Sequence, residues 1–254
     1  MAPVSVRKIH HVGVVVEKLA RAYGFYCDTL GLPLLREVVI KDQGVRAALL
    51  AARESEIELL EPVQAGTGVA RFLEKRGEGL HHLCFETGDV DASLRSLKAA
   101  GVALIDETSR EGLAGRIGFL HPKACAGVLV ELATPPNGSD PDASPLHLKR
   151  VVIGSQDPKE TARIFQRLFA LSEQGMNDGP RTMLSVGRGA LLLVPADEVG
   201  GLNGMVALSL VAEDYDAVSA RLHDASATML SGAGELTVEP KSSHGVHLHI
   251  SRFD

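Results

Sequence analysis

The chain has 254 residues, a formal net charge of −6 and no block of lysines and arginines, so neither nucleic acid nor an anionic membrane is expected as its main partner. Hydrophobic residues make up 45% of the sequence, which is ample for a core, and with 4% aromatic residues and no tryptophan that core must be aliphatic. Three cysteines, and an apolar run at 12–16 that is too short for a signal peptide or a membrane span, favour a soluble, cytoplasmic protein.

The first elements follow the order of one strand, one helix and three further strands. Residues 8–16 form a valine-rich apolar run that is typical of a strand. Apolar residues then recur at helical spacing as far as the helix-ending Gly31, at Leu19, Tyr23, Tyr26 and Leu30. Three segments with strand character follow, separated by turn-prone residues, at 35–40, 45–51 and 56–61. These residues predict a βαβββ module.

The same module recurs along the chain. In the second copy we expect a helix at 90–100, with Asp89 as its N-cap and Gly101 as its C-cap. Residues 150–171 align without gaps on residues 11–32, which begins a third copy. The sequence therefore repeats one βαβββ unit along its length.

A proline-rich segment, assigned as a linker at 136–146, divides the repeats into two halves. After it, Asp157-Pro158 has the sequence of a helix N-cap followed by the first turn. We therefore predict an α+β fold of four βαβββ modules with cup-shaped mixed sheets. The modules are assigned to two tandem domains, at 1–135 and 147–254.

The alternation of side chains along each strand decides which polar groups can meet. If the more apolar face of each strand packs under the helices, four polar side chains point into the cup: His11, Glu58, His82 and Glu131. His10 and His81 then fall on the helix-side face. A single strand histidine is usually a hydrogen-bonded core residue, but several buried polar groups without partners are costly, and a metal ion removes that cost. Two imidazoles and two carboxylates suit Co²⁺, Ni²⁺, Mn²⁺, Fe²⁺ or Zn²⁺ and leave positions for a bidentate substrate.

The second half has lost these groups. The alignment places Arg150, Leu191, Ala207 and His249 at the corresponding positions. His244, His247 and His249 form a cluster near the C-terminus without carboxylate partners, a pattern more typical of a structural role. We therefore expect a copy without the metal site, kept as scaffold, packing partner or lid.

Several motifs resemble those of a known family. They are His10-His-Val-Gly-Val-Val-Val, Gly79-Leu-His-His-Leu-Cys-Phe85, and Ile117-Gly-Phe-Leu-His-Pro-Lys123 leading to Gly127-Val-Leu-Val-Glu-Leu132. With them the chain resembles the vicinal oxygen chelate (glyoxalase/bleomycin resistance/dioxygenase) superfamily. Within that superfamily, residues 8–135 resemble methylmalonyl-CoA epimerase, whereas the second half is similar only in fold.

The resemblance implies a metal-dependent epimerase or isomerase of a 2-substituted malonyl-type acyl-CoA. The family's metal ligands fall on the four side chains named above, and the bound metal stabilises the enediolate that forms when the proton between thioester and carboxylate is removed. Inversion needs an acid/base group on each face of that carbon, and these fall on Glu131 and Asp42. Asp42 stands where the family usually has Glu, so the second base is one methylene shorter. The family's glycine-rich loop, with Gly115, and Lys123 are candidate substrate-binding residues.

Other functions stay open. A glyoxalase I-type lactoylglutathione lyase also uses two histidines and two glutamates, although the Phe-Leu-His-Pro-Lys segment weighs against it. A non-catalytic small-molecule-binding protein is disfavoured by the intact ligand set and favoured by the Asp42 substitution. An extradiol dioxygenase would need its ligands in the second half. The expected partner is a small molecule, and the chain is expected to be a monomer or a homodimer.

Overall fold

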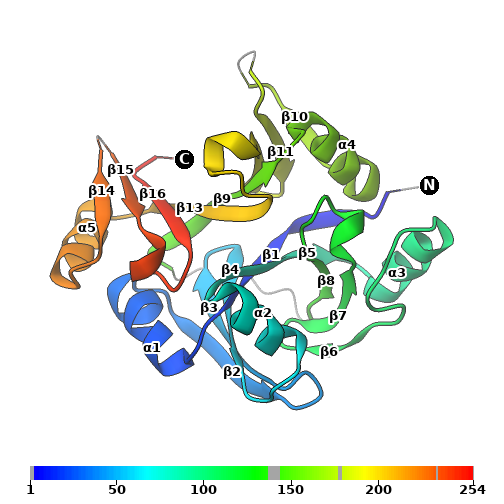
Figure 1. The fold of residues 1–254 in the computed structure, drawn as a ribbon, viewed down its shortest axis with the longest axis horizontal. Helices are drawn as coiled ribbons and strands as arrows, with labels where there is room; N and C mark the ends of the chain where they lie inside the picture. The colour runs from blue at the N-terminus through cyan, green and yellow to red at the C-terminus, as the bar shows by residue number, and fades with distance from the viewer. Residues whose placement is uncertain (1–2, 137–143, 177–178, 233, 254) are drawn as a thin grey trace. The chain divides into compact units, whose positions relative to one another are not determined.

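The computed structural model describes residues 3–136, 144–176, 179–232 and 234–253. Within them the strands form two eight-stranded mixed sheets, with the orders β2-β3-β4-β1-β5-β8-β7-β6 and β10-β11-β12-β9-β13-β16-β15-β14 (Figure 1). The two orders are the same, which confirms the predicted α+β fold of four repeated modules. Most of the predicted linker, residues 137–143, lies outside the described part of the chain.

The first sheet comes from two modules. The first module comprises β1 (Val6–Val15), α1 (Leu19–Tyr23), a π-helical segment η1 (Gly24–Thr29), β2 (Leu34–Ile40), β3 (Val45–Ala52) and β4 (Ser55–Pro62). The second comprises β5 (Gly79–Thr87), α3 (Val90–Ala99), β6 (Arg110–Gly112), β7 (Gly115–Leu120), a 3-10 turn η2 (Pro122–Ala124) and β8 (Val130–Thr134). Helix α2 (Gly68–Arg76) connects them.

The second sheet repeats this order. The third module comprises β9 (Leu146–Ser155), α4 (Pro158–Phe169), β10 (Ser172–Gln174), β11 (Thr182–Val186), β12 (Gly189–Pro195) and a 3-10 turn η3 (Ala196–Val199). The fourth comprises β13 (Gly204–Ala212), α5 (Tyr215–Asp224), β14 (Met229–Ser231), β15 (Glu235–Val238), a 3-10 turn η4 (Pro240–Ser242) and β16 (His247–Ser251). None of the helices within the described residues is long and apolar enough to cross a membrane.

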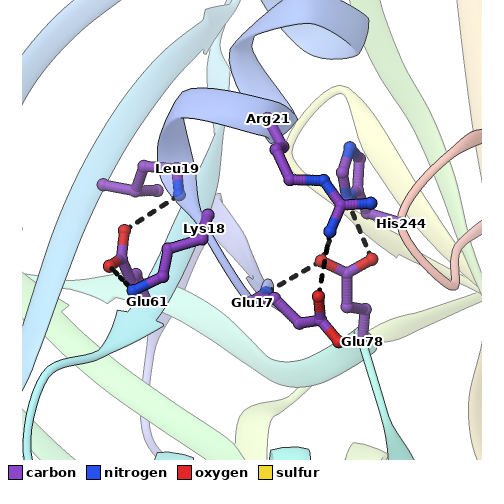
Figure 2. A network of polar contacts seen from close by, with 7 residues as sticks. All are labelled: Glu17, Lys18, Leu19, Arg21, Glu61, Glu78 and His244. Atoms are coloured by element: carbon purple, nitrogen blue, oxygen red, sulfur yellow. Dashed lines mark hydrogen bonds and ion pairs between the residues drawn. The ribbon is translucent and has the colours of Figure 1, made fainter.

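The helix starts are fixed by capping side chains. The Asp89 carboxylate accepts a hydrogen bond from the Ala92 N–H at the start of α3, and Asp157 accepts one from the Glu160 N–H at the start of α4, as the sequence predicted. Helix α1 has no such cap on its own segment, because its N-cap residue is Lys18. Figure 2 shows that Glu61, from the end of β4, takes over this role by accepting from the Leu19 N–H at 3.0 Å.

Two helical features differ from the sequence-based expectation. The helix expected to run to Leu30 is α-helical only to Tyr23, and the Leu30 N–H donates to the carbonyl of Phe25, five residues back. This π-helical segment begins at Gly24, and glycine destabilises a regular α-helix. Helix α2 was not predicted, although its N-cap Thr67 and the positive-φ Gly77 at its end are ordinary boundary signals.

The chain forms two compact units, each of which combines modules from both halves of the sequence. One unit contains β1 as far as His11 together with the second and third modules. Its core includes three of the chain's few aromatic residues: Phe169 of α4 packs against Phe85 of β5 at 5.1 Å and against Phe165 at 5.9 Å between ring centres. In this unit α3 lies beside β7 and β8 (Figure 1). The expected aliphatic core thus has an aromatic centre here.

The other unit contains the first module from Val12 onward and the fourth module. The fully buried Tyr26 of η1 donates its hydroxyl hydrogen to the carbonyl of Ser243, near the end of the chain, at 3.1 Å. Figure 2 shows a second link, in which the Glu78 carboxylate accepts from the Glu17 N–H at 2.8 Å and lies 2.9 Å from Nδ1 of His244. Polar contacts, one of them buried, therefore join segments that are far apart in the sequence.

Candidate functional site

Three of the four predicted metal ligands lie together in one compact unit. His11 of β1, His82 of β5 and Glu131 of β8 are 0%, 2% and 3% exposed. Nε2 of His11 lies 2.9 Å from Nε2 of His82, and Oε2 of Glu131 lies 3.1 Å from His82 Nε2 and 3.6 Å from His11 Nε2. The donor atoms of all three residues lie within 4.8 Å of one another. They converge on one buried point.

The strand register explains why these side chains meet. Strands β5 and β8 are parallel neighbours, and Cys84 pairs with Glu131, so His82 lies two residues away on the same face of β5. On the other side of β8, Phe119 of β7 pairs with Glu131, and its ring packs edge-on against His82 at 5.4 Å between ring centres. Cys84 and Phe119 belong to a hydrophobic cluster beside the site. The Phe119 ring thus packs directly against the His82 ring.

The cluster contains a buried carboxylate that stays ionised. Burial by itself raises the pKa of Glu131, but the charges and hydrogen bonds of His11 and His82 outweigh burial and hold the pKa of this carboxyl far below its usual range. A buried ionised carboxylate beside two imidazole nitrogens is a donor set that suits a divalent transition metal or zinc. The residues present therefore fit the metal that the sequence implied.

His10 takes part in the same arrangement, although sequence parity placed it on the opposite face. It is 2% exposed, and its Nδ1 lies 2.9 Å from Nδ1 of His11. The sequence displayed this pair, but strand alternation alone does not show that two adjacent histidines turn their rings toward each other. His10, His11 and Cys84 also form a second group of close potential metal-binding atoms.

The other proposed metal and acid/base residues lie in the second compact unit. Glu58 is buried on β4, opposite Leu49 of β3, and its place in the ligand set stays a prediction. Asp42 is exposed on the turn at 41–44 between β2 and β3. Its role as the second base likewise stays a prediction.

The two candidate substrate-binding residues lie in the unit of the three-residue cluster. Gly115 opens β7 opposite Gly112 of β6, so the glycine-rich loop is a two-residue hairpin turn. At Gly115 φ is +97°, and a Cβ there would meet the carbonyl oxygen of Thr134, so only glycine fits. Lys123 is exposed in η2, and its N–H donates to Nδ1 of His121. Their contact with a substrate stays a prediction.

The second half shows the expected substitutions in register. Ala207 pairs with His247 and Ser209 with His249 in the parallel β13–β16 pair, so His249 occupies the position that Glu131 has on β8. Burial and the neighbouring His247 lower the pKa of His249, against the opposing effect of Glu235. Within the described residues, the two groups of three close metal-binding side chains both lie in the first half.

Comparisons with known proteins also distinguish the first half of the chain from the second. A family model described as "Glyoxalase/Bleomycin resistance protein/Dioxygenase superfamily" matches residues 10–119. The chain is 38% identical over 129 residues to the uncharacterised protein YqjC of Bacillus subtilis, a match that covers 50% of this chain and 92% of that protein. It is 34% identical over 127 residues to the mitochondrial methylmalonyl-CoA epimerase of Mus musculus, which covers 49% of this chain and 71% of the mouse protein.

The solved structures that resemble this chain match either about half of it or nearly its whole length. A variant of Streptomyces coelicolor methylmalonyl-CoA epimerase in complex with 2-nitronate-propionyl-CoA is 39% identical and covers 52% of this chain and 99% of its own, with a TM-score of 0.51. A mutant of 4-hydroxymandelate synthase from Streptomyces coelicolor is 16% identical, with a TM-score of 0.71, and covers 97% of this chain and 92% of its own. The second likeness shows the fold of nearly the whole chain and nothing of its chemistry.

Proposed function

Because this chain belongs to the glyoxalase/bleomycin resistance protein/dioxygenase superfamily, we propose that it is a metal-dependent epimerase of a 2-substituted malonyl-type acyl-CoA. One observation carries the proposal: the buried cluster of His11, His82 and Glu131 lies in the half of the chain that is similar to methylmalonyl-CoA epimerases. The similarity spans about half of this chain, so the activity of the whole protein is part of the proposal.

The cluster residues would hold the cation, with Glu58 as the proposed fourth ligand. A bound divalent cation supplies a Lewis acid that stabilises negative charge on the substrate oxygens. Once their Nε2 atoms are unprotonated, His11 and His82 would offer lone pairs to the cation, and the Glu131 carboxylate would offset part of the cation's charge. Burial of all three groups strengthens their electrostatic interactions, because little water screens them.

Epimerisation also requires proton transfer on both faces of one carbon. Glu131 and Asp42 are the proposed acid/base pair. Glu131, a carboxylate at neutral pH, would accept the substrate proton on one face. Asp42, exposed on its turn, would take up a proton from solvent and deliver it to the opposite face. Exchange of the substrate α-proton in heavy water tests this pair, since each turnover must pass through a deprotonated carbon.

A non-catalytic binding protein is the second candidate. The exposure of Asp42 favours it, because an exposed carboxylate is less firmly held than a base inside a closed site. Such a protein would bind metal and an acyl-CoA without exchanging the α-proton, whereas the proposed epimerase exchanges it.

A further inference from the structure

The two ring nitrogens of His11 face different groups. Nε2 lies 2.9 Å from His82 Nε2 and 3.6 Å from Glu131 Oε2, in the candidate metal centre. Nδ1 lies 2.9 Å from Nδ1 of His10. The rings of His10 and His11 are nearly perpendicular, at 83°, with 5.1 Å between their centres, and both are buried. The His10 contact is therefore on the side of the ring that does not face the cluster.

The chemistry of imidazole fixes the direction of this hydrogen bond. A neutral imidazole carries one proton, so one ring nitrogen donates and the other has a free lone pair. Binding a metal through Nε2 of His11 requires the lone pair there, which places the His11 proton on Nδ1. His11 Nδ1–H then donates to His10 Nδ1, and His10 carries its own proton on Nε2.

We propose that His10 is a positioning residue for the metal centre: by accepting the Nδ1 proton of His11, it selects the tautomer and ring orientation that aim Nε2 of His11 at the metal. This inference rests on the proposed metal centre. Metal-binding histidines commonly donate their other ring N–H to a carboxylate or a carbonyl, and loss of such a partner costs 10- to 100-fold in metal affinity. Here a second imidazole takes that place.

The other histidine pair provides a matched control. His81 precedes the ligand His82 as His10 precedes His11, but its ring packs edge-on against Phe72 of α2 at 5.0 Å between ring centres. The two leading histidines therefore have different surroundings. A change at His81 tests the effect of replacing a histidine next to a ligand, without removing the His10–His11 hydrogen bond.

Cys84 provides a second control. Its sulfur and the ring nitrogens of His10 and His11 lie within 4.8 Å of one another, so His10 would be a ligand if a metal bound there instead. In that arrangement Cys84→Ser would weaken metal binding as much as a change at His10. In the proposed arrangement Cys84→Ser has little effect on metal binding.

The test is calorimetric titration of the full chain, without bound metal, with Co²⁺. We expect His10→Phe, which keeps a ring of similar size but removes the acceptor, to bind Co²⁺ about 10- to 100-fold more weakly with one ion still bound per chain. His10→Asn, whose side-chain oxygen can accept the same proton, should recover much of the affinity. His81→Phe and Cys84→Ser should bind as the unmodified chain does. An unchanged affinity in His10→Phe, no recovery in His10→Asn, or an equal loss in Cys84→Ser would each overturn the proposal.

A measurement on the unmodified chain keeps the proposal testable if a variant does not fold. Nitrogen-15 NMR of the Zn²⁺-loaded protein should show the proton of His11 on Nδ1 and that of His10 on Nε2. A His10 proton on Nδ1 would contradict the inference. The proposed function can fail separately: a chain that binds Co²⁺ but exchanges no α-proton is not the proposed epimerase, yet the role of His10 is still decided by these titrations.

Discussion

Nε2 of His82 and Oε2 of Glu131 lie 3.1 Å apart across the parallel strands β5 and β8, and both side chains are almost fully buried. Such a contact between an imidazole and a carboxylate is stable in a protein interior when each group has a partner. Removal of one partner leaves the other buried and unsatisfied. The pair is therefore a sensitive place to test whether the cluster binds metal.

We predict that His82→Ala strongly weakens Co²⁺ binding, because it removes the nitrogen closest to Glu131. Isothermal titration calorimetry should show the Co²⁺ affinity falling by about 100-fold or more. Loss of a residue that only hydrogen-bonds to a metal ligand already costs about 10- to 100-fold, so loss of a ligand itself should cost at least as much. His249→Ala is the matched control, since His249 holds the position of Glu131 in the second half, whose described residues include no group of three close metal-binding side chains. A His82→Ala chain that binds one Co²⁺ with unchanged affinity would refute the ligand assignment.

A second prediction concerns the start of α1. Glu61 accepts hydrogen bonds from the Leu19 N–H and the Lys18 ammonium group, which together outweigh the effect of burial and lower the pKa of Glu61 below its ordinary value of 4.5 (Figure 2). Glu61→Gln should lower the free energy of unfolding at pH 7 by about 1 kcal/mol, as loss of a helix cap does. Urea unfolding at several pH values measures it.

The pH dependence of this effect has a defined sign. Since folding lowers the pKa of Glu61, the ionised carboxylate stabilises the fold above the unfolded value of 4.5, and this stabilisation is lost as the pH falls through the folded pKa. The difference between the unmodified chain and Glu61→Gln should therefore shrink in acid. Glu17→Gln removes an exposed i,i+4 partner of Arg21 and should cost less than about 0.5 kcal/mol. A Glu61→Gln effect that grows in acid would contradict this account.

A third prediction concerns the close approach of two backbones in the unit that contains the first and fourth modules. Gly245 has a φ of +78°, and a Cβ there would overlap the carbonyl oxygen of Glu78. Gly245→Ala should therefore destabilise the protein by roughly 2 to 4 kcal/mol, from strain and the forced separation of the two segments. Thermal and urea unfolding provide the measurement.

Gly101→Ala separates the two causes of that loss. Gly101 has a similar φ of +74°, but a Cβ there would have no atom within 4 Å, so its substitution should cost only about 1 kcal/mol of backbone strain. If both substitutions cost the same, the close approach of Gly245 to Glu78 does not contribute to stability.

Much of the fold could be predicted from local pattern. The strands expected at 45–51 and 56–61 are found at Val45–Ala52 and Ser55–Pro62, because alternating and continuous apolar runs bounded by turn residues specify strands well. The internal repeat then predicted four modules. Contacts such as Tyr26 with Ser243 could not be predicted, since the repeat does not say which modules pack together.

The candidate site could also be predicted in part. Strand parity selected His11, His82 and Glu131, which the structure brings together, because side chains on one face of neighbouring strands must meet. Parity could not reveal the contact of His10 with His11, which depends on ring rotation about the side-chain bonds rather than on strand direction. The positions of Glu58 and Asp42 in the site stay predictions.

The central claim is tested most directly by α-proton exchange. The full chain, loaded in turn with Co²⁺, Ni²⁺, Mn²⁺, Fe²⁺ or Zn²⁺, is incubated in heavy water with a single epimer of methylmalonyl-CoA. Deuterium at the α-carbon is followed by NMR, together with the change in optical rotation as the other epimer forms. We predict metal-dependent deuteration and conversion to the other epimer, both of which are absent from His82→Ala. Full metal binding without exchange under any of these metals would contradict the proposed epimerase and favour a binding protein.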